Sequence, residues 1–196
     1  MALLRTVAPA YSPRFIIKEN GNYIVPNYAA KEIYWHDNAF NILRTVTFAY
    51  NPMCIIKEDG GYVVTDYVNK KIYWYDNAFT LLRTVTLPYI PLSLIKEGGN
   101  YIVLDYDNHK INWYDNDFTL LRTVTLGYDP FSIVKEDGGY IVTDYNNKKI
   151  DWYDNDFTLL RTVTLGYFPF STVQEDGNYI VAEFTTAKLY WYDNKF

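Results

Sequence analysis

Short apolar stretches recur along the chain and are separated by turn residues. In residues 132–164 the four stretches are SIVKE, YIVTDY, KIDWYDN and FTLLRTVT, with Asp, Asn, Gly and Lys between them. β-Branched and aromatic residues favour strands, whereas Gly, Asn and Asp favour turns. No window keeps apolar residues at helical spacing for long. This segment therefore predicts a four-stranded antiparallel sheet.

The same unit occurs five times, with 39 residues from one RTV to the next, as from Arg5 to Arg44. Residues 1–196 are expected to form one domain, with the repeats at 2–40, 41–79, 80–118, 119–157 and 158–196. A unit of this length with four strands has the size of a β-propeller blade. We therefore predict an all-β, five-bladed propeller of four-stranded antiparallel blades.

The two ends of the chain are complementary. ALLRTV at the start resembles the outermost strand of a blade, KLYWYDNKF at the end resembles a third strand with its turn, and Phe196 followed by Ala2 reproduces an internal repeat junction. Residues 2–8 can therefore complete the last sheet and close the ring, which removes two exposed strand edges. An open solenoid is the alternative, but it requires polar capping repeats that neither end provides.

Residues 130–163, PFSIVKEDGGYIVTDYNNKKIDWYDNDFTLLRTV, resemble an NHL-repeat blade. The resemblance lies in the Pro, the Ile three residues later, the hairpin Gly, the Asp that closes the second strand, the Asn-rich link and the aromatic-Asp turn. It extends over all five units, although Asn27 and Glu183 replace the closing Asp and NHL rings more commonly have six blades. It implies a propeller that recognises a peptide or protein segment, and RNA binding occurs among such propellers.

Several residues are constant across the units, and we interpret them as structural. The third-strand tryptophans are expected between neighbouring blades, the hairpin glycines at positive φ, and the Asp of each Asp-Asn turn as an acceptor of backbone N–H groups. The outer-strand arginines are expected to discourage pairing with other chains. The glutamates that end each innermost strand are expected to be solvated turn charges screened by neighbouring lysines, with a cation site as the alternative. These glutamates are Glu19, Glu58, Glu97, Glu136 and Glu175.

Variation is concentrated in the loops that emerge on one face of the predicted ring. These loops are the segments around each Pro before a blade and the links between second and third strands. We predict that this face binds a partner and that its apolar residues gather near one channel mouth, although some residues after the Pro can simply plug the channel. Neutral drift is the alternative, but it is expected to affect both faces. The candidate binding residues are Arg14, Asn51, Met53, Ile90, Leu92, Asp107, Asn108, Asp129, Phe131, Asn146, Phe168 and Phe170.

The composition argues against several kinds of chemistry. A net charge of −5 disfavours nucleic acid as a partner. The single Cys54 and the two histidines, His36 and His109, are too few for a metal site or a convincing base and nucleophile pair. The segment DYDNH at 105–109 lacks the Gly and Glu of a calcium loop. We therefore expect a non-enzymatic monomer without metal or cofactor. The chain as given has no apolar run that could cross a membrane and no signal peptide, and its location stays open.

Three functions remain in consideration. The first is recognition of a protein or peptide through the variable face, as the NHL resemblance implies. The second is a lectin, because Tyr- and Asn-rich faces suit sugars and repeated blades offer several weak sites. The third is an engineered or trimmed propeller with no evolved ligand. One asymmetric site favours the first function, whereas several equivalent sites favour the second.

Overall fold

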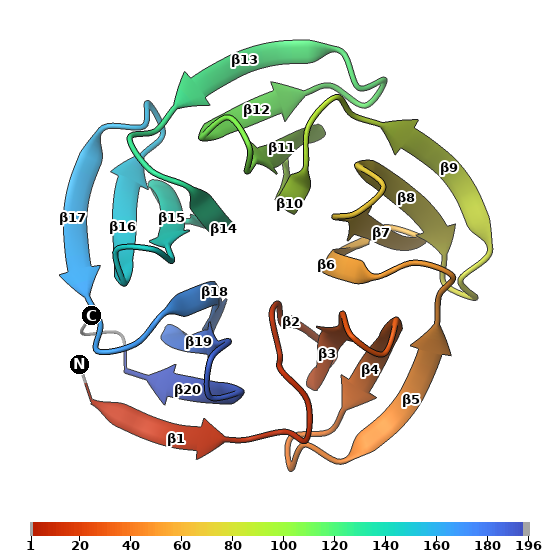
Figure 1. Cartoon of the computed structure of the whole chain (residues 1–196), viewed down its shortest axis with the longest axis vertical. Coiled ribbons are helices and arrows are strands. Elements are labelled where there is room, and N and C mark those ends of the chain that lie inside the picture. The colour runs from red at the N-terminus through yellow and green to blue at the C-terminus, as the bar shows by residue number, and fades with distance from the viewer. Residues whose placement is uncertain (1, 194–196) are drawn as a thin grey trace.

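The structure is a computed structural model that describes residues 2–193. Its described residues form twenty strands in five four-stranded antiparallel sheets and no helix. Figure 1 shows the sheets as blades around one axis, with the first strand of each blade near the axis and the last at the circumference. The predicted five-bladed propeller is confirmed. The described residues offer no helix that is long and apolar enough to cross a membrane.

The strands fall into four classes by their distance from the axis. The innermost strands are β2 (Ile17–Glu19), β6 (Pro52–Glu58), β10 (Pro91–Glu97), β14 (Pro130–Glu136) and β18 (Pro169–Glu175). The second strands are β3 (Asn22–Asn27), β7 (Gly61–Asp66), β11 (Asn100–Asp105), β15 (Gly139–Asp144) and β19 (Asn178–Glu183). The third strands are β4 (Glu32–His36), β8 (Lys71–Asp76), β12 (Lys110–Tyr114), β16 (Lys149–Asp154) and β20 (Lys188–Tyr192). The outermost strands are β5 (Ile42–Thr47), β9 (Leu81–Thr86), β13 (Leu120–Thr125), β17 (Leu159–Thr164) and β1 (Leu3–Val7). We number the blades from blade 1 (β2–β5) to blade 5 (β18–β20 with β1).

The N-terminal strand closes the ring. β1 pairs antiparallel with β20, and the register runs from Leu3 opposite Tyr192 to Val7 opposite Leu189. Figure 1 shows β1 lying along the outer edge of the last blade, beside β20. The prediction of closure is confirmed for the strand, whereas Phe196, which completes the predicted junction, lies outside the described residues.

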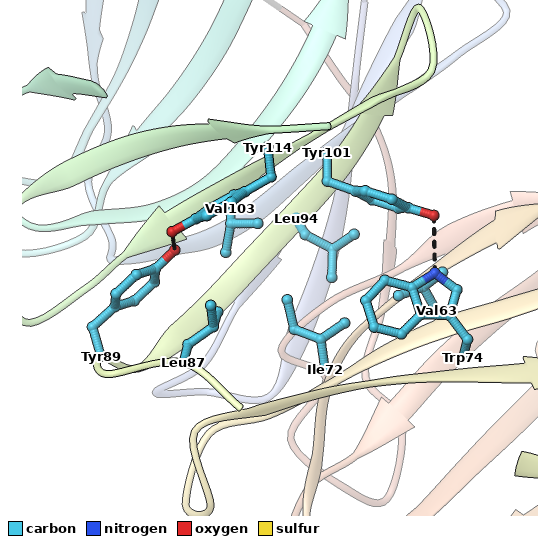
Figure 2. Close-up of a cluster of buried hydrophobic side chains, with 9 residues drawn as sticks. All are labelled: Val63, Ile72, Trp74, Leu87, Tyr89, Leu94, Tyr101, Val103 and Tyr114. Carbon is cyan, nitrogen blue, oxygen red and sulfur yellow. Dashed lines mark hydrogen bonds between the residues drawn. The ribbon is translucent and has the colours of Figure 1, made fainter. Parts of the chain in front are cut away.

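The hydrophobic core is divided among the interfaces between neighbouring blades. Figure 2 shows the interface between blades 2 and 3, where Ile72 and Trp74 of one blade pack against Leu94 and Tyr101 of the next. The indole N–H of Trp74 donates a hydrogen bond to the Tyr101 hydroxyl at 2.9 Å. The tryptophan of every blade lies in such a cluster, as predicted. Burial of these large rings makes the blade interfaces the main source of stability.

In the turns on the face opposite the links, the glycines and aspartates have their predicted roles. A phenylalanine that the sequence analysis did not identify also contributes. Gly60 has a φ of +86°, and the Asp76 carboxylate accepts the backbone N–H groups of Ala78 and Thr80, each at 2.8 Å. Phe79 has a φ of +66°, an uncommon conformation for a bulky residue. Its ring stacks on Tyr62 at 4.8 Å and meets Trp35 of the preceding blade edge-on at 5.4 Å. These contacts hold the strained turn between two blades.

Four of the five glutamates at the ends of the innermost strands pair with lysines, as predicted, but all five are half-buried and not freely solvated. Glu19 of blade 1 lies 3.3 Å from the Lys57 ammonium of blade 2 and accepts a hydrogen bond from the Tyr62 hydroxyl at 2.8 Å. The Glu19 side chain is only 17% exposed. At three other interfaces a lysine of one blade pairs with the equivalent glutamate of the preceding blade. Between blades 4 and 5, Gln174 takes the place of the lysine and donates to Glu136. These carboxylates therefore join each blade to the next.

The outer-strand arginines also contact the neighbouring blade. The Arg83 guanidinium lies over the Trp74 ring, 4.9 Å from its centre, and donates to the backbone carbonyl of Asn116 in the next blade. Arg5 makes the corresponding contacts with Trp191 and the Asn38 carbonyl. Their role therefore extends beyond the predicted protection of strand edges.

Candidate functional site

A cup opens on the ring axis, on the face that carries the links between second and third strands. Its volume is about 300 Å³, at the lower end of the range of small-ligand sites. Each blade contributes two residues to it, one on the innermost strand or just before it and one in the link. The first set, which we call the floor, comprises Arg14, Met53, Leu92, Phe131 and Phe170. The second set, which we call the wall, comprises Tyr28, Tyr67, Tyr106, Tyr145 and Phe184.

The floor residues follow the Pro that precedes or begins each innermost strand. Because this strand is nearest the axis, its side chains converge with those of the other blades. Met53 and Leu92 are 1% and 2% exposed, and they form one buried cluster with Phe15, Cys54, Phe131 and Phe170. The cluster fills the ring axis beneath the cup. Four of the five floor residues therefore form the plug that the sequence left open as an alternative.

The wall residues were missed by the sequence analysis. The signal was present, because an aromatic residue follows the last residue of the second strand in all five repeats. None of the four wall tyrosines has a hydrogen-bond partner for its hydroxyl within residues 2–193. Burial raises the pKa of Tyr67 and Tyr106, so both phenols stay protonated at neutral pH and can donate hydrogen bonds. The cup thus combines a floor that is apolar in four of the five blades with four available hydroxyl donors in its wall.

Arg14 makes the cup asymmetric. The other floor positions hold Met, Leu or Phe, whereas blade 1 places a guanidinium there. Its central carbon lies 3.9 Å from the centre of the Tyr28 ring and 4.9 Å from that of Phe184. Both contacts have cation–π geometry. The one hydrogen bond of the guanidinium goes to the Met53 sulfur at 3.7 Å, a weak acceptor, and no carboxylate of residues 2–193 forms an ion pair with it.

A groove of about 550 Å³ leaves the cup beside blade 1, and Arg14, Tyr28 and Phe184 line both hollows. The sequence explains why the groove lies here. Residues equivalent to Pro9 donate their N–H to the link of the preceding blade, as Leu87 does to Lys70 at 2.8 Å. Proline has no N–H to donate. The innermost strand of blade 1 also has three residues, whereas those of the other blades have seven.

The other predicted binding residues lie outside the lining of the cup. Asn51 donates to the Tyr28 backbone carbonyl at 2.7 Å and so positions the wall. Asn108 donates to the buried Asp105 carboxylate at 2.9 Å, and Asn69 and Asn147 make the same contact in their own blades. This shared contact shapes the link in three blades, and binding by Asn108 stays a prediction.

The remaining five contact neighbours around the same face. Asp129 accepts from Asn146 at 2.8 Å and lies 3.2 Å from the His109 ring. Asp107 lies 3.5 Å from the Lys70 ammonium, and Phe168 packs on Tyr145 with ring centres 5.0 Å apart. Ile90 is half-buried, and its carbonyl accepts the Tyr106 backbone N–H at 3.3 Å.

The described residues contain no group of three His, Cys, Asp or Glu side chains placed to hold a metal ion. The two histidines lie in different blades and have different partners. His36 is buried and meets the Tyr11 hydroxyl at 2.6 Å, whereas His109 pairs with Asp129 at the surface. Cys54 is buried beneath the cup, where burial raises the pKa of its thiol to about 11. A thiol with that pKa stays protonated and is a poor nucleophile.

No protein-family model matches the chain, and no curated protein matches it in sequence. Among solved structures it is similar to the glutaminyl cyclase of Myxococcus xanthus, with a TM-score of 0.80 and 10% identity over 97% of this chain and 94% of that one. Virginiamycin B lyase from Staphylococcus aureus gives 0.62 and 14%, covering 96% and 73% of the two chains. BBS1N, solved in complex with ARL6DN, gives 0.55 and 16%, covering 90% and 62%. At these identities the similarity shows the propeller fold alone.

Proposed function

We propose that this chain is a non-enzymatic binding propeller whose cup takes a segment of a peptide or protein. The observation that carries the proposal is the cup itself, in which five aromatic side chains enclose a floor of four apolar residues and Arg14, on the face where the repeats differ. Aromatic side chains and Arg are the residues enriched at the centres of protein-binding surfaces. The structural neighbours do not decide between classes, because they include two enzymes and a protein solved with a protein partner.

The asymmetry of the cup supports a peptide over a sugar. A lectin with one site per blade would present five equivalent surfaces, whereas here one central cup is shared by all blades and Arg14 distinguishes one side of it. The cup lining also contains no His, Cys, Asp, Glu or Lys that could act as a general base. A single hollow with one cationic side fits a ligand that binds in one orientation.

The first prediction concerns peptide binding. A random-peptide library is selected on the wild-type protein, and the winning peptides are titrated against Tyr67→Ala and Tyr73→Ala. Tyr67 lines the cup, and Tyr73 is a half-buried tyrosine of the same blade outside it. We expect the first substitution to weaken binding roughly tenfold or more, as for an aromatic residue at the centre of an interface, and the second to leave it unchanged.

Two results would contradict the proposal. One is a selection that yields no peptide whose binding depends on Tyr67. The other is a glycan array on which one sugar binds at several equivalent sites per chain and keeps its affinity in Tyr67→Ala.

A further inference from the structure

We propose that the cup recognises the free C-terminal carboxylate of a peptide, which pairs with Arg14 beside the unpartnered wall hydroxyls. This inference rests on the proposed peptide-binding function and specifies the chemistry of its ligand. It concerns the side of the cup where blade 1 departs from the other four blades.

The first support is the environment of Arg14. The guanidinium lies against the faces of Tyr28 and Phe184, yet the described residues provide it with no carboxylate and only a sulfur acceptor. Removal from water lowers the pKa of Arg14, which reflects a charge that burial disfavours. An incoming anion compensates that cost, and the planar fork of a guanidinium matches the two oxygens of a carboxylate.

The second support is the set of hydroxyl donors around the guanidinium. Tyr28, Tyr67 and Tyr145 line the same cup as Arg14, and the Tyr28 ring lies directly against its guanidinium. None of these hydroxyls has a hydrogen-bond partner within the described part of the chain. Unpaired hydroxyl donors beside a cation are arranged for an anion rather than for a second cation.

The shape of the cup favours a chain end over an internal segment. The buried cluster around Met53, Leu92 and Phe131 blocks the ring axis, so a ligand can enter only from the link face. A volume of about 300 Å³ is small for a segment that must both enter and leave. A terminal residue places its side chain on the apolar floor and its carboxylate at Arg14, while the preceding residues leave through the adjoining groove. Capture of a terminal carboxylate is an established mode of peptide recognition.

The groove next to Arg14 provides that exit. Small side chains line much of it, including Ala10, Ser12, Ala29 and Ala30. Little side-chain bulk therefore separates an extended peptide from the backbone at the junction between blades 5 and 1. The guanidinium stands where groove and cup meet, so one cation can fix which end of the peptide enters the cup.

The experiment compares two chemical forms of the C-terminus of one peptide. A peptide selected from a library displayed with free C-termini is synthesised as the acid and as the C-terminal amide, and both are titrated by calorimetry. A third form carries an amidated end and a glutamate at the last position, which separates a side-chain carboxylate from a main-chain one. We expect the acid to bind wild type roughly tenfold to a hundredfold more tightly than the amide, with the third form as weak as the amide.

Variants of Arg14 test the partner directly. Arg14→Met introduces the residue that the next blade carries at this position, and it should abolish the difference in affinity between the acid and the amide. Arg14→Lys, which keeps the charge and loses the fork, should restore part of the difference. Lys71→Met, which removes a positive charge outside the cup, serves as the control for long-range electrostatics.

The outcomes distinguish this inference from the function on which it rests. Equal affinities of acid and amide, both lost in Tyr67→Ala, would overturn the carboxylate inference and leave the peptide-binding cup intact. An acid preference that survives in Arg14→Met would also overturn it. A tighter third form would assign the site to side-chain carboxylates instead. Binding of all forms that is indifferent to Tyr67→Ala would contradict the proposed function itself.

Discussion

A pair of side chains joins each blade's third strand to the connection that leads into that blade. In four blades the pair is two tyrosines whose hydroxyl oxygens lie 2.7–3.0 Å apart, such as Tyr89 and Tyr114 in Figure 2. In blade 1 the second tyrosine is His36, which meets Tyr11 at 2.6 Å. The other ring nitrogen of His36 faces the Phe40 carbonyl at 3.2 Å, so Nδ1 carries the proton and Nε2 accepts from Tyr11.

The presence of His36 in place of tyrosine predicts that blade 1 makes the folding stability depend on pH. Burial lowers the pKa of His36 below its ordinary value of 6.5, against the opposing effects of the Phe40 carbonyl and Asp37. The unfolded chain therefore binds more protons than the folded one as the pH falls through 6.5, and folding stability decreases until the pH passes the folded pKa. His36→Tyr, which restores the residue of the other blades, should remove this decrease.

Urea unfolding at pH 7.5 and pH 5.5 measures the effect. The difference in unfolding free energy between wild type and His36→Tyr should change in favour of the variant at the lower pH, because all other titrating groups are shared. If that difference is the same at both pH values, the assignment of His36 as a neutral buried group is wrong.

The pairing between the second and third strands of a blade takes two forms. In blades 2 and 4 the second strand begins with Gly61 or Gly139, and each pairs with the Asp that ends the third strand. A Cβ on Gly61 would lie 1.8 Å from the Tyr75 carbonyl oxygen. Blades 1, 3 and 5 have Asn at this position, and their third strands end one residue earlier. One missing Cβ therefore decides whether this pairing forms.

Gly61→Ala should destabilise the protein by about 1–3 kcal/mol, the usual cost of forcing extra atoms into a packed site. Gly127→Ala is the matched control, because a Cβ there meets nothing within 4 Å. Chemical unfolding of both variants provides the comparison. Equal stabilities would show that the close approach to the Tyr75 carbonyl is not part of the folded protein.

The ring combines near-symmetry with one irregular sector. The blades share a core, a set of turns and a set of interfacial glutamates and arginines. Pro9, Arg14 and the short β2 all fall at the junction where β1 completes blade 5 and the chain passes into blade 1. Closure by β1 brings this sector next to Phe184, so the same pairing that completes the ring completes the cup.

The repeat made the architecture predictable, because each blade encodes its own strands and turns. Most of the contacts that could not be predicted from the sequence lie between blades. Glu19 meets Lys57 and Tyr62 of the next repeat, and such a pairing depends on the rotation from one blade to the next, which no single repeat specifies. The conformation of Phe79 was hidden for the same reason, since its support comes from Trp35 of the preceding blade.

The candidate site was predicted in part. Differences among the repeats indicated a set of candidate binding residues, and five of them converge on one hollow. These five are Arg14, Met53, Leu92, Phe131 and Phe170. The wall was missed because its aromatic residues are almost constant, and constant positions were interpreted as structural. The sequence left open whether the floor residues plug the channel, because their burial depends on how closely the innermost strands approach the axis.

Met53 provides a direct measurement of ligand binding in the cup. Met53 is one of two methionines in the chain, lies on the cup floor and has its sulfur 3.7 Å from Arg14. In protein labelled at the methionine methyl groups, the Met53 signal is assigned with Met53→Leu, the residue that blade 3 carries. We predict that a selected peptide shifts this signal saturably, with the dissociation constant found by calorimetry. Calorimetric binding that leaves the Met53 signal unmoved would contradict binding in the cup.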